Sequence, residues 1–244
     1  MYNLFTILKI VNYMILTILG LIVYYLNLPD YLMRFLFNLT LKNINLKIKT
    51  NIDNFDNYNS LIIVSNHYNM TDYLILNSLF LNNYTVVKSD LFLNSLKNTS
   101  FLEKIYLHLD KYISKGVKLI KYQRNDRNSG IIVKNTIVDY VKQKRNIIVF
   151  PEGTSSRSGR PKEFKNGLFK LAEEKHIDIL PVTLKYEKDI GLNKEDIFNV
   201  NNLFNQKCRV YIHPIVSYKK ENLKDYVHNI ILKKYDELDI SNDQ

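Results

Sequence analysis

The chain has few of the residues that punctuate or cross-link a fold. Its 244 residues include 7 glycines, 5 prolines, 1 cysteine and no tryptophan. The single cysteine, Cys208, excludes an internal disulfide and is typical of a protein from a reducing compartment. No His-x-x-x-His pattern or acidic cluster occurs at the spacing of metal ligands. We therefore expect neither a metal site nor a bound cofactor.

Negative charge is scarce relative to positive charge. The sequence has 34 lysines and arginines against 24 aspartates and glutamates, which gives a net charge of +10. A basic surface suits nucleic acid, anionic lipid or a polyphosphate-bearing ligand such as coenzyme A. Because no basic stretch interleaved with aromatic residues forms a recognisable nucleic-acid-binding motif, we do not expect a nucleic-acid partner.

Long apolar runs are confined to the N-terminal part of the chain. Residues 10–28 are mostly apolar, and as a helix they would reach about 28 Å, close to the roughly 30 Å hydrocarbon core of a bilayer. Residues 31–41 repeat apolar side chains at helical spacing, as in a helix lying in a membrane interface. We expect residues 1–43 to form an apolar helical membrane anchor, as one span or as two helices in one leaflet. A buried hairpin of two core helices is the alternative.

Residues 44–244 alternate between strand and helix patterns, which predicts one α/β domain. We expect a single mixed sheet flanked by helices. The predicted strands are residues 46–49, 61–65, 85–88, 117–122, 147–150, 179–184 and 209–212. The predicted helices are residues 72–80, 101–111, 130–144, 164–174 and 221–238.

A histidine and an aspartate follow the buried strand at residues 61–65. On one continuous helix, His67 and Asp72 would lie about 140° apart and could not meet. With His67 in the turn and Thr71 as the helix N-cap, Asp72 in the first helical turn can approach the imidazole. A carboxylate on one imidazole nitrogen fixes the tautomer and leaves the other nitrogen free to act as a base. A capping or surface histidine is the alternative for such a pair alone.

A second polar segment, "PEGTSSR" at residues 151–157, follows the predicted strand at 147–150. Loops at the carboxyl ends of strands in α/β sheets are where ligands bind. Together, "NHYNMTD" (66–72) and "FPEGTSS" (150–156) resemble the NHxxxxD and FPEGTRS motifs of the glycerolipid acyltransferase family, the lysophosphatidate acyltransferase-like enzymes. Further resembling blocks follow in the family's order between residues 44 and 235: "VVKSDLF" (86–92), "LIKYQR" (119–124), "FKNGLFKLA" (164–172), "ILPVTL" (179–184) and "VYIHPI" (210–215).

The resemblance implies transfer of a fatty acyl group from acyl-CoA or acyl-carrier protein to the free hydroxyl of a lysophospholipid. The favoured acceptor is 1-acyl-glycerol 3-phosphate, which would give phosphatidic acid. His67 would be the general base, and Asp72 would orient it. The residues expected to bind the acceptor are Arg124, which would hold its phosphate, and Glu152, Gly153, Thr154, Ser155 and Arg157. Ser155 stands where the family commonly has arginine, and Arg157 would substitute for that arginine.

No serine or cysteine lies in a nucleophile-elbow setting, so we expect direct transfer without an acyl-enzyme. Lipid substrates would place the protein at a membrane, with the active site on its cytosolic face. Three alternatives stay open. The acceptor could be glycerol 3-phosphate or another lysophospholipid, the same dyad could activate water in a hydrolase, or the protein could bind lipid or acyl-CoA without turnover.

Overall fold

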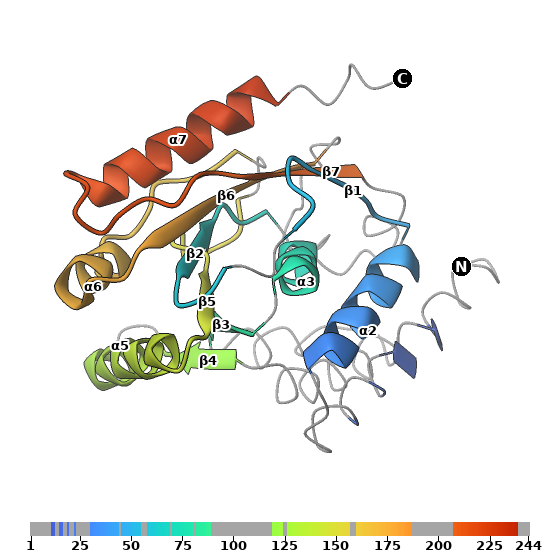
Figure 1. Ribbon diagram of the computed structural model, residues 1–244, viewed down its shortest axis with the longest axis horizontal. Helices are drawn as coiled ribbons and strands as arrows, with labels where there is room; N and C mark the ends of the chain where they lie inside the picture. Colours follow the sequence, from blue (N-terminus) through green and yellow to red (C-terminus); the bar gives the residue numbers. More distant parts are fainter. Residues whose placement is uncertain are drawn as a thin grey trace.

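The computed structural model describes residues 11–12, 15–16, 19, 22, 30–43, 45–54, 58–68, 70–80, 82–88, 119–123, 126–156, 160–186 and 207–238. Within these residues, seven strands form one sheet (Figure 1). Their order across the sheet is β1-β7-β6-β2-β5-β3-β4. The strands are β1 (Lys47–Thr50), β2 (Ile62–Ser65), β3 (Asn83–Lys88), β4 (Leu119–Tyr122), β5 (Asn146–Val149), β6 (Ile179–Tyr186) and β7 (Lys207–Ile212).

The sheet is mixed, as the sequence predicts. β6 and β7 pair antiparallel, with Thr183 opposite Tyr211 and Tyr186 opposite Cys208. The other neighbouring strands pair parallel. β2 lies between β5 and β6, so the turn that follows it opens at the middle of the sheet edge where the parallel strands end.

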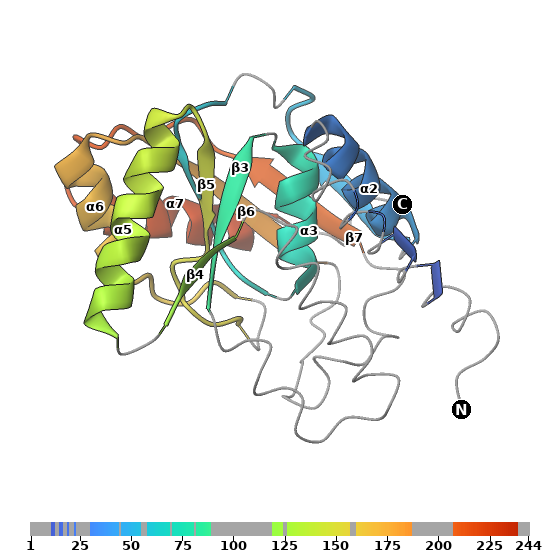
Figure 2. The ribbon, with the colours of Figure 1, turned by 90° about the horizontal axis from the view of Figure 1, so that it is seen from below.

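Helices cover both faces of the sheet. α2 (Asp30–Asn43) and α3 (Met70–Leu79) pack against each other on one face. α5 (Arg127–Lys142), α6 (Gly167–Lys175) and α7 (Leu223–Glu237) cover the other face, as the two perpendicular views in Figures 1 and 2 show. The helix predicted at residues 101–111 lies outside the described residues.

The strand sequences explain this three-layer arrangement. Successive side chains of a strand point to opposite faces, so a strand made only of apolar residues suits a sheet that is covered on both sides. In β2, Ile63 joins the core cluster under α3, whereas Ile62 and Val64 join the cluster under α5, α6 and α7. All three side chains are fully buried. This central strand therefore fixes the chain immediately before the polar turn.

The described part of the N-terminal segment packs on α2. The Asn12 side-chain amide donates to the Asn43 side chain at 2.9 Å, and Leu16 is buried with Leu36. α2 is tied to α3 in turn, because the Arg34 guanidinium donates to the Ser78 carbonyl at 2.9 Å. Among the described residues, no helix has the length and apolar character needed to cross a bilayer. Most of the predicted span, residues 10–28, lies outside them.

Candidate active site

The turn between β2 and α3 is anchored by Asn66, which is fully buried. Its side-chain amide donates to the Leu184 carbonyl at 2.8 Å, and its side-chain oxygen accepts from the Leu184 N–H at 2.8 Å. Asn66 thus continues the pairing of β2 with β6 by one residue, through its side chain. This pair of bonds fixes the backbone from which His67 projects.

His67 and Asp72 are in contact, as their predicted placement in the turn and the first helical turn requires. His67 Nδ1 lies 2.9 Å from Asp72 Oδ2. Asp72 is fully buried, and the His67 side chain is 24% exposed. The Phe150 ring stacks on the imidazole at 4.4 Å between centroids. With Nδ1–H donating to the carboxylate, Nε2 is the nitrogen that remains to accept a proton.

The Asp72 carboxylate receives two donors besides the imidazole. The Tyr68 N–H donates to Oδ2, and the Tyr186 hydroxyl donates to Oδ1 at 2.6 Å. The prediction of Thr71 as the N-cap is wrong, because α3 begins at Met70 and Thr71 lies inside the helix. The Thr71 hydroxyl instead lies 2.7 Å from the Tyr186 hydroxyl.

The segment after β5 holds the backbone of His67 on both sides. Glu152 Oε1 accepts from the His67 N–H at 3.0 Å, and the Ser156 N–H donates to the His67 carbonyl at 2.7 Å. The two motif segments are 85 residues apart in the sequence at the first of these contacts. They therefore form one site at the carboxyl ends of β2 and β5.

Burial sets the ionisation of Glu152. The residue is 6% exposed, and loss of solvation raises the pKa of its carboxyl group from 4.5 to about 7. The His67 N–H and the nearby imidazole partly offset this rise. The second oxygen, Oε2, is buried and has no hydrogen-bond partner among the described residues. Glu152 thus changes charge near neutral pH within contact of His67.

The other predicted acceptor residues are placed as follows. Gly153 adopts a left-handed conformation with φ +70°, where a Cβ atom would lie 2.6 Å from Lys165 Nζ. Thr154 is exposed, and the Ser155 carbonyl accepts from Lys162 Nζ at 2.9 Å. Arg124 and Arg157 lie outside the described residues.

Two contacts of the site have no local signal in the sequence. Tyr186 follows the resembling block 179–184 and comes 114 positions after Asp72, so only the folded sheet brings them together. Asn66 stands in the first motif, but its bonds to Leu184 depend on the β2–β6 pairing. No group of three or more His, Cys, Asp or Glu side chains that could hold a metal ion occurs in the part of the chain that the structure describes.

Comparison with known proteins gives consistent matches. The acyltransferase family model matches residues 47–185. The 1-acyl-sn-glycerol-3-phosphate acyltransferase of Borreliella burgdorferi is 28% identical over 201 residues, which cover 79% of this chain and 73% of that protein. The probable enzyme of the same name from Mycoplasma genitalium is 29% identical over 201 residues, covering 75% of this chain and 68% of that protein.

A longer plant relative and a crystal structure extend this picture. The Arabidopsis thaliana chloroplastic 1-acyl-sn-glycerol-3-phosphate acyltransferase LPAT1 is 26% identical over 197 residues, 77% of this chain but 49% of that protein. The crystal structure of the 1-acyl-sn-glycerophosphate acyltransferase PlsC from Thermotoga maritima has the same fold, with a TM-score of 0.58 and 17% sequence identity. The match covers 98% of this chain and 100% of that chain.

Proposed function

This chain belongs to the acyltransferase family, and from that premise we propose that it acylates 1-acyl-glycerol 3-phosphate to give phosphatidic acid. The donor is an acyl thioester, either acyl-CoA or acyl-carrier protein. The observation that carries the proposal is the 2.9 Å contact between His67 Nδ1 and buried Asp72, at the carboxyl end of the central strand. The names of the relatives support the choice of acceptor.

The geometry supports a direct transfer. His67 Nε2 takes the proton from the acceptor hydroxyl as its oxygen attacks the thioester carbonyl carbon. Asp72 stabilises the imidazolium that forms and keeps Nδ1 protonated. When the tetrahedral intermediate collapses, the carbon–sulfur bond breaks and the leaving thiolate takes the proton back from the imidazolium. The carbon–oxygen ester bond is then complete, and the dyad returns to its initial state.

The acceptor would bind beside the loop that follows β5. Glu152, Gly153, Thr154 and Ser155 shape this side of the site, and Glu152 directly contacts the His67 backbone. An arginine matches a phosphate with two parallel hydrogen bonds, so Arg124 and Arg157 remain the proposed phosphate ligands.

The N-terminal segment would hold the enzyme on its lipid substrate, at the cytosolic face of a membrane. Val11, Ile15, Leu19 and Ile22 are helical and between 41% and 50% exposed. They recur at three- and four-residue intervals, which is the spacing of one helical face. Leu16, on another side, packs on Leu36 of α2. An apolar face that the described protein core does not cover suits contact with lipid.

The activity is tested in membranes that contain the full-length protein. They are incubated with labelled acyl-CoA or acyl-carrier protein and with a panel of acceptors: 1-acyl-glycerol 3-phosphate, glycerol 3-phosphate and other lysophospholipids. We expect labelled phosphatidic acid, with His67→Ala lowering its rate by about 10²- to 10⁴-fold. His176→Asn is the matched control. His176 is exposed at the end of α6, just before the amino end of β6, whereas the site lies at the carboxyl ends of the parallel strands.

The outcomes separate the alternatives. Product from another acceptor would correct the acceptor alone. Labelled free fatty acid that depends on His67 would indicate a hydrolase. Saturable binding of acyl-CoA or lysophospholipid without product would indicate a binding protein, and equal rates for wild type and His67→Ala would reject the proposed base.

A further inference from the structure

We propose that Tyr186 is a positioning residue of this site, whose hydroxyl holds the carboxylate of Asp72 in the orientation that His67 requires. The residue lies at the last position of β6, outside both motif segments. Its kinetic consequence rests on the proposed function, whereas its effect on the His67–Asp72 pair does not.

The two oxygens of Asp72 have separate partners. Oδ2 faces His67 Nδ1 at 2.9 Å, and Oδ1 accepts from the Tyr186 hydroxyl at 2.6 Å. Because Asp72 is fully buried, its charge depends on donors from the protein rather than from water. The tyrosine hydroxyl thus holds the carboxylate oxygen that does not face the imidazole, and it shares the negative charge of Asp72 with His67.

Tyr186 is itself held in place. Its hydroxyl lies 2.7 Å from Thr71 Oγ1, and its ring lies against the Tyr68 ring at 5.1 Å between centroids. Since the Tyr186 proton points to Asp72, the Thr71 hydroxyl donates to the Tyr186 oxygen. Burial, followed by the charge of Asp72, raises the pKa of Tyr186 well above its usual value. The hydroxyl therefore remains a donor throughout the range in which a histidine titrates.

The hydroxyl also moderates the negative charge that His67 meets. Among the described residues, Glu152 and Tyr186 are ionisable groups next to the pair, and the buried thiol of Cys208 lies next to the tyrosine. Burial and the charge of Asp72 raise the pKa of Cys208, so the thiol stays neutral. Removing the tyrosine hydroxyl leaves more uncompensated charge on Asp72. This charge would bind the imidazolium more tightly, so the histidine would release its proton at higher pH.

The test is Tyr186→Phe, which keeps the ring and removes one hydroxyl. The ring protons of ¹³C-labelled histidine are followed by NMR as the pH changes, and His67→Ala assigns the His67 signal among the five histidines. The protein that retains Tyr186 and the Tyr186→Phe variant both also carry Glu152→Gln, because Glu152 titrates near pH 7 beside His67. We expect the midpoint of the His67 titration to rise by about half a pH unit, from the loss of one hydrogen bond to the carboxylate.

Acyl transfer gives the second readout, in proteins that retain Glu152. We expect Tyr186→Phe to lower kcat by about tenfold and to move the acid limb of the pH profile upward, as the titration midpoint moves. Thr71→Val removes the partner of Tyr186 and should shift both readouts in the same direction by less. Thr71 and Tyr186 act through one series of hydrogen bonds that ends at Asp72. The variant with both substitutions should therefore show less than the sum of the two single effects.

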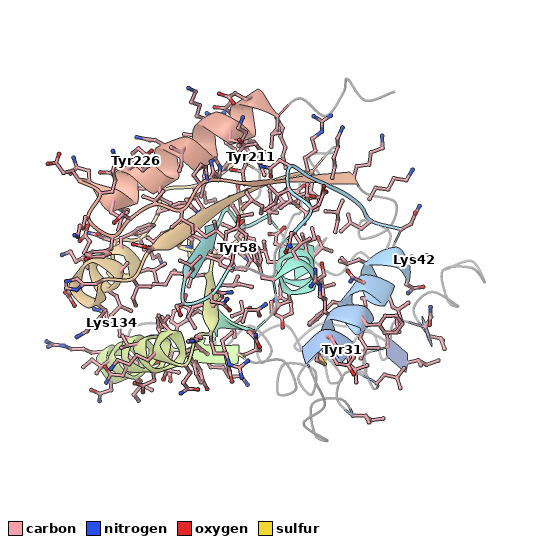
Figure 3. The ribbon with its side chains drawn as sticks, in the orientation of Figure 1. Tyr31, Lys42, Tyr58, Lys134, Tyr211 and Tyr226 are labelled. Atoms are coloured by element: carbon pink, nitrogen blue, oxygen red, sulfur yellow. The ribbon has the colours of Figure 1, made fainter. Side chains whose placement is uncertain are left out.

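Tyr211→Phe is the control. Tyr211 lies on β7 under α7 (Figure 3), where Lys234 Nζ sits 4.4 Å from the centroid of its ring. This variant should leave the His67 titration unchanged. An unchanged or lowered midpoint in Tyr186→Phe would overturn the proposal, even if that variant were less stable. The NMR titration needs no turnover. If the protein showed no acyl transfer, the proposed function would be rejected, but the titration would still test the role of Tyr186.

Discussion

At the scale of single residues, the imidazole of His67 is held more firmly than a dyad alone requires. Its ring contacts Asp72 and Phe150, while Glu152 and Ser156 hold its backbone N–H and carbonyl. A base placed in this way needs little rearrangement to meet an incoming hydroxyl. One of these supports, Glu152, is ionisable near neutral pH, so stability and pH are coupled at the site.

We predict that wild type loses stability relative to Glu152→Gln as pH rises. The pKa of Glu152 is about 7 in the folded protein and 4.5 without burial, so the folded state keeps a proton that the unfolded chain releases between these values. The contribution of the protonated Glu152 to the free energy of unfolding is fully present below pH 4.5 and is lost as pH rises through 7. The difference of 7 − 4.5 pH units corresponds to at most about 3 kcal/mol. Denaturant unfolding of both proteins from pH 4.5 to 8 measures it.

A matched substitution isolates the effect of burial. Glu173→Gln changes an exposed glutamate on α6 and should follow wild type at every pH. The other titrating groups affect wild type and each variant equally, so their effects cancel when the two free energies of unfolding are subtracted at the same pH. One is His213, where burial lowers the pKa to about 4. Parallel stability curves for wild type and Glu152→Gln would show that the carboxyl group stays ionised in the fold.

At the scale of elements, the described part of the loop between β5 and α6 contains a residue in the left-handed conformation. Gly153 has φ +70°, and its N–H donates to the Phe150 carbonyl at 3.1 Å. A residue with a Cβ atom is strained there, and Lys165 Nζ would have to move. This turn sets the direction of Glu152 toward His67, so its geometry bears on both folding and the site.

We predict opposite effects of alanine at two glycines. Gly153→Ala should lower the free energy of unfolding by about 1–2 kcal/mol, because of its left-handed conformation. Gly130→Ala should raise it by about 0.5–1 kcal/mol, since Gly130 is helical in α5 and its Cβ atom would meet no atom within 4 Å. Denaturant unfolding measures both. A Gly153→Ala protein as stable as wild type would mean that the loop adopts another conformation at no cost.

The sequence predicts the elements well because their patterns are local. The strand predicted at residues 61–65 is β2 (Ile62–Ser65), and the one at 179–184 lies inside β6. Helix starts are less well predicted. The helix expected from 164 begins at Gly167, since Lys165 uses its N–H for the Pro151 carbonyl. Strand order and the Tyr186–Asp72 bond depend on long-range pairing, which no local pattern contains.

The candidate site shows the same division. The spacing of His67 and Asp72 predicts their contact, because the short turn that holds His67 leads directly into the first helical turn, which holds Asp72. It does not predict that Glu152 holds the backbone of His67, since that contact depends on how β2 and β5 are aligned. The catalytic and acceptor-binding roles of all these residues stay predictions.

At the scale of the whole molecule, the sheet separates two surfaces of different character. α2 and the described N-terminal residues lie on the same face as α3, whose first turn carries Asp72. α5 lies across the sheet (Figure 2) and also exposes apolar side chains, Ile131 at 51% and Ile132 at 64%. Exposed isoleucines on both faces allow a matched comparison of which surface meets lipid.

We predict that the membrane is bound by the exposed apolar residues of the N-terminal segment and not by those of α5. Replacing Val11, Ile15, Leu19 and Ile22 together by asparagine should weaken partitioning to anionic vesicles by on the order of a hundred-fold or more, because four apolar side chains no longer enter the lipid. Ile131→Asn with Ile132→Asn should leave partitioning unchanged. Vesicle co-sedimentation measures both, and circular dichroism verifies that each variant is folded. Equal losses from the two faces would instead indicate that lipid binding depends on exposed apolar area in general, and the anchor would then lie elsewhere.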